Sequence, residues 1–416
     1  MRSRRGRERL KKLLVYGAQF AAAFSDAVGF GWTVPSPVHD WASLIAAKDR
    51  EIDRLEGVYR KLLSDSGVTL LEGRGRLVGP HTVEVNGKRY TAANILVATG
   101  AHPVMPAIRG IEHVITSNEA LDLPSLPRRI VIVGGGYIAV EFAGIFHSLG
   151  AEVRLVIRSD DLLKGFDDDI RVSLAQEMRA RGIEIHARTQ IARIDKHDHG
   201  YDLATTQGEI FSADLVMYAT GRRPNTRGIG LEEIGVQLDK ANAIAVDEWS
   251  RSTVPHIYAV GDVTDRLNLT PVAIAEGRAL AETLFNDNPI KIDHANVPTA
   301  VFSQPPVGTV GLTERQARQI HGAVDIYRAR FRPMKNTLSG RSERSMMKPV
   351  VDQKTDRVLG CHIIGAEAGN LIAEVVLAIE FGASSEDIAR TCHSHPTLTE
   401  AVRQAAMAVE GWTMQM

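Results

Sequence analysis

The segment 128–158 constrains the fold of this chain more than any other part of its 416 residues. An apolar run, IVIV, leads directly into Gly134, Gly135 and Gly136; a helical pattern follows to Gly150, and a second apolar run, VRLVI, ends the segment. This order predicts a strand, a tight turn, a helix and a second strand parallel to the first, because parallel neighbours need a crossover connection. The segment therefore predicts one half of a doubly wound α/β domain.

The glycine turn has the spacing of a dinucleotide-binding loop. Gly134, Gly136 and Ala139 fit the pattern G-x-G-x-x-[G/A]. The first glycine allows the tight turn, the second lets a pyrophosphate approach the backbone, and the small third residue lets helix and strand pack closely. The N-terminus of the helix favours the phosphate charge. The strand before the motif and the helix and strand after it favour dinucleotide binding over a turn without a ligand.

The end of the second strand indicates which dinucleotide binds. NAD sites carry an acid there for the ribose 2′-hydroxyl. This chain has Arg158 at that place, and Lys164 follows six residues later. Two cations favour the 2′-phosphate of NADP. The alternative is that they form solvated charge pairs with Asp160 and Asp161.

Other parts of the chain carry further strand signals. The runs NILVATG (94–100) and LVMYATG (215–221) end alike, which suggests two similar nucleotide-binding units. The dipeptide at residues 86–87, Asn-Gly, lies between two alternating segments and predicts a hairpin. HIYAVGD (256–262) predicts another buried strand, and from about residue 296 the pattern changes to mixed strands and helices.

Composition excludes several classes of protein. Hydrophobic residues make up 44% and charged residues 24%, with a formal charge of -1, which is ordinary for a globular protein and argues against nucleic-acid binding. Two cysteines exclude a disulfide scaffold and a Cys-rich metal domain, so no metal site is predicted. The start, MRSRRGRERLKK followed by LLVYGAQFAAAF, is similar to a signal peptide, but we interpret it as an amphipathic helix that begins a buried element. No other stretch is long enough to span a membrane. We expect a cytoplasmic protein without a membrane partner.

The order of motifs resembles one family, the pyridine-nucleotide flavoprotein disulfide reductases, and within it the glutathione reductases. The resemblance covers residues 11–402 and rests on KKLLVYGAQF, NILVATG, GGGYIAVEFAGI, YATGRRPNT, YAVGD, LTPVAIAEGR, VFSQPPVGTVGLTE and HPTLTE, in that order. It implies two Rossmann-like nucleotide-binding domains and a C-terminal α+β domain that forms a homodimer. We expect FAD-binding segments at 1–125 and 245–295, an NADP-binding domain at 126–244 and an interface domain at 296–416.

The resemblance also implies a reaction, the NADPH-dependent reduction of glutathione disulfide through FAD and a cysteine pair. His395 would protonate the departing thiolate, which has a pKa of about 8.5 as a free thiol, and Glu400 would orient the ring. Tyr137 would cover the flavin face. Lys11 and Glu141 would form an ion pair beside the flavin, where a buried cation favours the reduced, anionic ring.

Further residues match binding positions of the family. Arg278 suits a tripeptide that bears carboxylates, which favours glutathione over a polyamine-linked disulfide. The matched residues are Gly134, Gly135, Gly136, Ile138, Ala139, Arg158, Lys164, Gly221 and Arg222 for NADP, Gly75, Gly261, Asp262 and Thr270 for FAD, and Arg278 and Tyr59 for glutathione disulfide.

The N-terminal part departs from the family pattern. The family begins with an FAD-binding βαβ unit and a Cys-x4-Cys pair before Pro-Lys-Lys, whereas ten residues precede Lys11 here and a βαβ unit needs about 30. The two cysteine positions hold Ser3 and Glu8, and the proline position holds Leu10. We therefore expect an N-terminal truncation, as a wrongly started gene model would produce. FAD binding should be weak or absent, because the first strand of the sheet and the phosphate loop are missing.

The remaining cysteines are Cys361 and Cys392. Cys361 lies in an apolar strand, where a buried, inert thiol is expected. Cys392 precedes His395 by three residues, but a redox pair must bring its Cα atoms within about 7 Å of each other. We expect neither cysteine to replace the lost pair. Three functions stay open: a glutathione reductase that is inactive alone, a flavoprotein that passes electrons from NADPH to quinones or oxygen, and a non-enzymatic dimerisation module.

Overall fold

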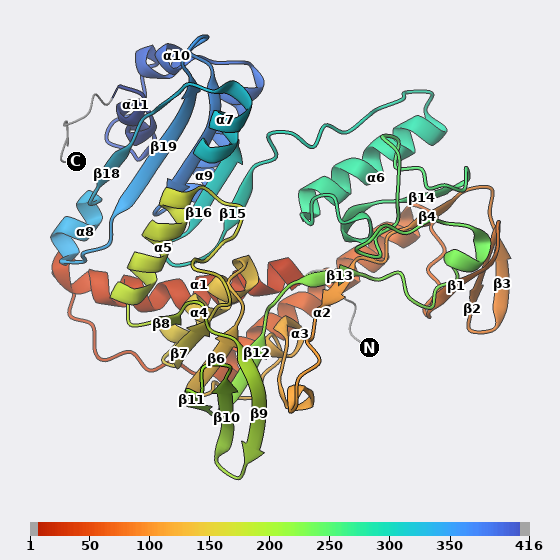
Figure 1. Ribbon diagram of the computed structural model, residues 1–416, viewed down its shortest axis with the longest axis horizontal. Coiled ribbons are helices and arrows are strands. Elements are labelled where there is room, and N and C mark those ends of the chain that lie inside the picture. The colour runs from red at the N-terminus through yellow and green to blue at the C-terminus, as the bar shows by residue number, and fades with distance from the viewer. Residues whose placement is uncertain (1–6, 408–416) are drawn as a thin grey trace. The chain divides into compact units, whose positions relative to one another are not determined.

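The computed structural model describes the backbone of residues 7–407 and the side chains of residues 11–406 (Figure 1). Contacts divide the chain into two compact units. The first unit contains the residues up to Ile52, Met105–Thr220 and the residues from Ala295 on; the second contains Asp53–Val104 and Gly221–His294. This division by contacts does not test the four domain segments that we expected from the sequence, so those segments remain a prediction.

The central part of the first unit is built on a parallel sheet with the order β12-β6-β7-β8. β6 (Arg129–Val133), α4 (Tyr137–Ser148) and β7 (Glu152–Val156) confirm the strand, turn, helix and strand predicted for this segment. Strand β6 is almost wholly buried because its neighbours and α4 cover it. The other elements are η2 (Ile111–His113), α3 (Ser117–Ala120), α5 (Asp168–Ala180), β8 (Glu184–His186), β12 (Leu215–Tyr218), and the antiparallel β9 (Ile191–His197), β10 (Gly200–Thr205) and β11 (Ile210–Ala213).

The C-terminal part of the first unit is an antiparallel sheet with the order β15-β16-β20-β19-β17, and β18 also pairs with β19. Helices α9 and α11 contribute buried apolar side chains to the core of this part. The bounds are β15 (Thr299–Val301), β16 (Val307–Gly311), α7 (Glu314–His321), β17 (Val324–Ile326), β18 (Ala329–Phe331), α8 (Met334–Ser339), β19 (Ser345–Asp352), β20 (Val358–Ile364), α9 (Ala368–Glu380), α10 (Ser385–Arg390) and α11 (Thr399–Met407).

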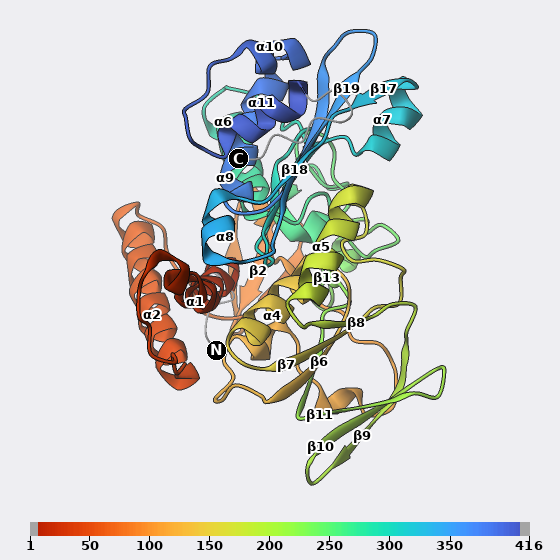
Figure 2. The same ribbon diagram turned by 90° about the vertical axis from the view of Figure 1, so that its left-hand side faces the viewer.

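The helix α1 (Arg7–Ala27) lies against α4 and α8 of the same unit (Figure 2). Leu14, Val15 and Ala18 are fully buried on the face that packs inward, as expected for a helix that begins a buried element. Residues 11–30 are also long and apolar enough to cross a membrane by length and composition alone, which the sequence-based expectation did not include. η1 (Val28–Phe30) follows this helix, and α2 (Trp41–Asp65) comes next in the chain.

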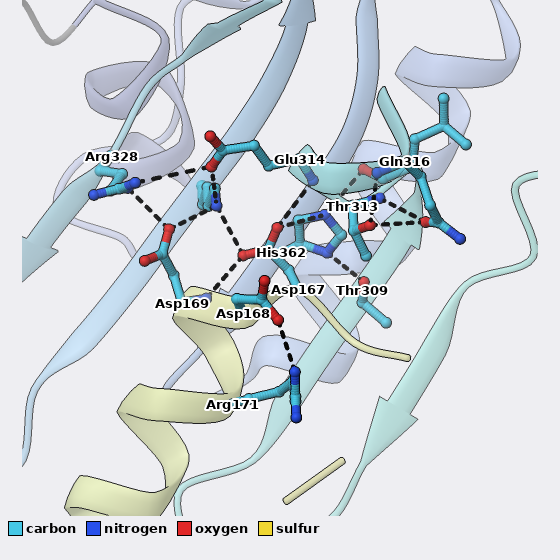
Figure 3. A network of polar contacts seen from close by, with 12 residues as sticks. Asp167, Asp168, Asp169, Arg171, Thr309, Thr313, Glu314, Gln316, Arg328 and His362 are labelled. Carbon is cyan, nitrogen blue, oxygen red and sulfur yellow. Dashed lines mark hydrogen bonds and ion pairs between the residues drawn. The ribbon is translucent and has the colours of Figure 1, made fainter. Parts of the chain in front are cut away.

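A buried polar network joins the two parts of the first unit (Figure 3). The ammonium of Lys348, on β19, is 2.8 Å from an oxygen of Asp167, 2.6 Å from Asp169 and 2.7 Å from Glu314. Burial alone would raise the pKa of Asp167, but the interactions with His362 and Lys348 hold it below its usual value. Because Asp167 also caps the N-terminus of α5, the network fixes the start of that helix on the C-terminal sheet.

The second unit contains small sheets. β2 (Thr82–Val85) and β3 (Lys88–Thr91) form the hairpin predicted at Asn86 and Gly87, both of which have a positive φ as this turn requires. In the described part of the unit, β4 (Ile95–Val97) and β14 (Ile257–Ala259) form a parallel sheet of only two strands. The other elements are β1 (Gly75–Gly79), β5 (Ala101–Pro103), β13 (Arg222–Pro224), η3 (Glu232–Ile234), η4 (Gly261–Thr264) and α6 (Thr270–Phe285).

Candidate functional site

The glycine turn between β6 and α4 leaves open space at the N-terminus of the helix. Gly134 has a φ of 136°, and a Cβ atom there would overlap the carbonyl of Ala219 at the end of β12. Only glycine fits this close approach. Gly136 is the N-cap residue of α4, no side chain caps the helix at this position, and nothing lies within 4 Å of the place where its Cβ would be. The turn therefore offers backbone N–H groups and space to an anionic ligand.

The other residues of the motif and of the first turn of α4 are packed as this geometry requires. Ala139 is fully buried, as expected for the small third residue of the motif. A Cβ on Gly135 would lie 3.2 Å from a methyl group of Ile157, a tight contact that would require Ile157 to shift by a few tenths of an ångström. Ile138 and Tyr137 are half-buried in the first turn of α4.

The loop after β7 carries the two predicted cations. Arg158 and Lys164 are exposed, and neither has an acidic partner among the described side chains. The nearby acids are paired elsewhere: Asp160 accepts a hydrogen bond from Arg188, and Asp161 lies 3.7 Å from a guanidinium nitrogen of Arg171. The acids of the loop thus contact arginines from outside the loop, and no described acid lies within ion-pair distance of Arg158 or Lys164.

Lys11 and Glu141 form the ion pair that the resemblance implied. Both side chains are largely buried, with 11% and 1% of their surface exposed. The other carboxylate oxygen of Glu141 accepts a hydrogen bond of 2.8 Å from the backbone N–H of Phe302. The ammonium of Lys11 also lies 5.1 Å from the ring centroid of Tyr137. A buried acid that is bonded on both oxygens holds this cation in place.

The adjacent Lys12 was not singled out in the sequence. Its ammonium lies 3.6 Å from the ring centroid of Phe302, and burial lowers its pKa. Nothing in the spacing of α1 distinguishes it from an ordinary exposed lysine, so only the contact with a residue far along the chain reveals it.

His395 and Glu400 also contact each other. Nδ1 of His395 lies 3.0 and 3.1 Å from the two carboxylate oxygens of Glu400, and the backbone N–H of Thr397 donates to the same group at 3.1 Å. The hydrogen bond from His395, followed by that from Thr397, lowers the pKa of Glu400. The His395 side chain is 72% exposed. A carboxylate on Nδ1 orients the ring and leaves Nε2 to exchange a proton with an external group.

In the second unit, the turn at Gly261 is held by an acid that sequence reasoning missed. The buried carboxylate of Glu276, on α6, accepts hydrogen bonds from the Gly261 N–H at 2.7 Å, from His294 at 2.8 Å and from Arg266 at 2.9 Å. A single acid in the apolar run VAIAEGRALA was the available signal, because a buried acid needs partners. Asp262 directly follows the positioned turn.

The other predicted residues of the second unit are spread over its surface. Gly75, Tyr59, Thr270 and Arg278 are exposed. Gly221 has a φ of 131° and open space beside it. The neighbouring guanidinium of Arg222 donates to the carbonyl of Ala101 at 2.5 Å, within the antiparallel pair of β13 and β5.

The two cysteines are free thiols. Cys361, on β20, is fully buried, and burial raises its pKa to about 12, so it is protonated and unreactive at neutral pH. Cys392 is exposed in the segment after α10. Across the described residues, no group of three or more His, Cys, Asp and Glu side chains is arranged to hold a metal ion.

The described residues fit NADP better than FAD, the two cofactors that we expected from the sequence. The glycine turn, Arg158 and Lys164 form a suitable holder for a dinucleotide with a 2′-phosphate. For FAD, the turn at Gly261 and the ion pair of Lys11 are present, each within its own unit. Between residues 7 and 407, however, no second glycine turn of this kind links a strand to a helix, so these residues offer no holder for the FAD pyrophosphate.

Comparisons with known proteins agree on one relationship. The family model described as pyridine nucleotide-disulphide oxidoreductase matches residues 7–277, and the dimerisation domain of the same family matches residues 297–406. A glutathione reductase of Burkholderia cepacia is 48% identical over 94% of this chain and 87% of that protein. The chloroplastic/mitochondrial glutathione reductase of Pisum sativum is 49% identical over 94% of this chain and 71% of that protein. Among solved structures, the HOCl-induced flavoprotein disulfide reductase RclA from Escherichia coli has a TM-score of 0.87 at 26% identity and covers 96% of this chain and 89% of its own.

Proposed function

The chain belongs to the pyridine nucleotide-disulphide oxidoreductase family, and from this premise we propose that it binds NADPH and carries the nucleotide and acid–base parts of a glutathione-disulfide reductase. The observation that carries the proposal is the open glycine turn at Gly134–Gly136 beside Arg158 and Lys164, two cations without acidic partners among the described side chains. Similarity to glutathione reductases over 94% of the chain supports glutathione disulfide as the substrate that these two parts would serve, while the cysteine pair that would reduce it is missing.

The nucleotide part binds and orients the reductant. The N–H groups at the start of α4 would hold the pyrophosphate, and the charges of Arg158 and Lys164 would attract the 2′-phosphate. Bound NADPH supplies a hydride. Tyr137, the first residue of α4, would lie next to the nicotinamide end of NADPH. Lys11 would present a fixed positive charge beside the ring of Tyr137.

The acid–base part would move a proton. A departing thiolate with an ordinary pKa of about 8.5 leaves more readily when it is protonated. The Nε2 atom of His395 would donate that proton, while Glu400 on Nδ1 stabilises the imidazolium before the transfer. The dimerisation domain supports a homodimer as the form in which this histidine acts.

The chain has no equivalent of the cysteine pair that would react with the disulfide. Cys361 is buried as a neutral thiol, and the exposed Cys392 stands alone. We therefore propose that this chain binds NADPH without reducing glutathione disulfide.

A titration with the two reduced nucleotides tests this proposal. The protein should bind NADPH at least tenfold more tightly than NADH at low salt, because only NADPH meets both loop cations. A replacement of both Arg158 and Lys164 by Ala should remove the difference. Equal affinities of the original chain for the two nucleotides would contradict the proposal.

A second function, NADPH oxidation by a flavin without disulfide chemistry, is supported by one observation. The buried pair of Lys11 and Glu141 is present although the chain has no cysteine pair. The absorbance spectrum of the purified protein distinguishes the alternatives. A flavin band with NADPH consumption by quinones but not by glutathione disulfide would favour this second function. A stable dimer without flavin and without NADPH binding would favour a non-enzymatic dimerisation module.

A further inference from the structure

We propose that Arg188 is a positioning residue of the nucleotide site, which neutralises Asp160 and thereby leaves the charges of Arg158 and Lys164 to a 2′-phosphate. The inference rests on the proposed binding of NADPH. It goes beyond that function because it assigns nucleotide selectivity to a residue outside the loop, one that acts through Asp160 and does not touch the nucleotide.

The argument begins with the charge of the loop. Between residues 158 and 164 the sequence places two cations and two acids, so the formal charge of the loop is zero. A loop with unpaired acids would repel a phosphate dianion almost as strongly as its cations attract it. The loop attracts a phosphate only if its acids are neutralised by cations from elsewhere in the fold.

Two arginines outside the loop do this. Arg188, which follows β8, donates through Nε to Asp160. Arg171, on α5, lies near Asp161 and also donates through Nε to the carbonyl of Leu162 at 2.9 Å. Figure 3 shows that Arg171 also contacts Asp168 in the first turn of the same helix, at 2.7 Å. Each acid of the loop thus meets a cation that comes from another element.

The loop is also held in one place relative to the glycine turn. The backbone N–H of Leu163 donates to the carbonyl of Gly135 at 2.7 Å, and the hydroxyl of Ser159 donates to the carbonyl of Asp161 at 2.8 Å. The end of the loop is fixed by the contact of Asp167 with Lys348. A fixed loop keeps its charges at set positions, so a single neutralised acid changes the field at the phosphate position.

The backbone of Arg188 indicates a role other than folding. Its φ is 53°, a left-handed conformation that is unfavourable for a residue with a Cβ atom. Two hydrogen bonds maintain it: its N–H donates to the carbonyl of Ser159 at 3.1 Å, and its own carbonyl accepts from the side chain of Gln207 at 2.7 Å. Arg188 and Asp160 are 79% and 66% exposed, and such surface pairs add little to stability. A strained residue in a weak pair is better explained by its effect on the loop.

The variant Arg188→Gln tests the inference by nucleotide titration at low ionic strength. Binding of NADPH should weaken by about 3- to 10-fold, because the charge of Asp160 then opposes the phosphate, whereas binding of NADH should not change. The effect should shrink in 0.5 M salt. The matched control is Arg193→Gln, which removes an exposed arginine paired with Asp195 at 2.8 Å on β9; it should leave both affinities unchanged.

The double variant Asp160→Asn with Arg188→Gln tests whether Arg188 acts through Asp160 or contacts the phosphate itself. If Arg188 acts by neutralising Asp160, the double variant should regain an NADPH affinity within about 2-fold of the original chain. A double variant as weak as Arg188→Gln would overturn the inference, since Arg188 would then contact the phosphate itself. An unchanged NADPH affinity in Arg188→Gln would also overturn it. Failure of the proposed function looks different, because the original chain would then not prefer NADPH to NADH.

Discussion

Two strands of this protein are followed by the same three residues, Ala-Thr-Gly, but lie in different surroundings. β12, in the first unit, pairs with β6 of a four-stranded sheet, and its residues Val216 and Met217 are fully buried. β4, in the second unit, pairs with β14 alone in the described chain, and Leu96 at its centre is 48% exposed.

The difference lies in what meets the end of each strand. After β12, the N–H of Ala219 donates to the carbonyl of Val133, and its own carbonyl lies against Gly134 of the glycine turn. After β4, Thr99 exchanges hydrogen bonds with Asn225 at 2.8 and 2.9 Å, so a side-chain amide closes that end. An identical strand ending therefore does not define a nucleotide site. We propose that the neighbouring glycine turn does.

The largest expected effect is that of Gly134→Ala, compared with Gly100→Ala at the end of β4. The added methyl group of Gly134→Ala would overlap the Ala219 carbonyl at a φ that disfavours alanine, so the turn must rebuild and NADPH affinity should fall by about 1,000-fold. Gly100 also has a positive φ, of 70°, but nothing lies near its Cβ position.

Fluorescence titration with NADPH measures both variants, and thermal unfolding supplies the control for folding. Gly100→Ala should lose only about 1 kcal/mol of stability and keep its NADPH affinity. If both variants bind NADPH equally well, the contrast between the two strand ends has no functional meaning.

A smaller effect is expected from Lys348→Met, which removes the shared partner of three carboxylates in the first unit. The variant leaves Asp167 buried without its cation, so the free energy of unfolding of this unit should fall by about 3 kcal/mol. Denaturant unfolding followed by circular dichroism measures it. Replacement of the exposed Lys354 by Met, in the turn after β19, should change stability by less than about 0.5 kcal/mol. Equal stability of the two variants would show that the buried network does not join the two parts.

In the second unit, Glu276→Ala should lower the free energy of unfolding by less than Lys348→Met does in the first unit. It leaves the N–H of Gly261, Arg266 and His294 without their shared acceptor, which should cost about 2 kcal/mol. Hydrogen exchange can localise the loss, with faster exchange at Gly261 and unchanged protection in β6. Glu282→Ala, which removes a more exposed acid of the same helix, serves as the control. Faster exchange in β6 would mean that the stabilities of the two units are not separate.

The smallest expected effect is a pH dependence of the first unit. Burial raises the pKa of Glu314, but hydrogen bonds from Lys348 and Arg318 outweigh it and hold the pKa below its ordinary 4.5; Asp167 is likewise held below 3.8. A lowered carboxyl pKa adds stability above the ordinary value and loses it as the pH falls through the folded value. The original chain should therefore lose stability below about pH 4, and Lys348→Met should lose less over the same range. If the stability of Lys348→Met falls with pH as steeply as that of the original chain, the pH dependence does not come from the carboxylates that Lys348 contacts.

Much of the local structure of the proposed nucleotide site could be predicted from local spacing. The strand, turn and helix around Gly134, the small Ala139 and the hairpin at Asn86 follow from patterns within a few residues, because φ, packing distance and turn type act locally. The ion pair of Lys11 with Glu141 came from the resemblance to a family, since no local rule pairs residues 130 positions apart. The contact of His395 with Glu400, five positions apart, also came from that resemblance.

The sequence by itself determined the glycine turn, the cations that follow β7 and the absence of a Cys-x4-Cys pair. Only the tertiary structure decided which charges remain free. The chain has 49 Lys and Arg against 50 Asp and Glu, and nothing in their order assigns Arg188 to Asp160 or Lys348 to Asp167. Charge pairing acts through space over a few ångströms, so it depends on which elements the fold brings together. For this reason the residues that we propose to set the field of the nucleotide loop become visible only when β8, α5 and β19 are in place.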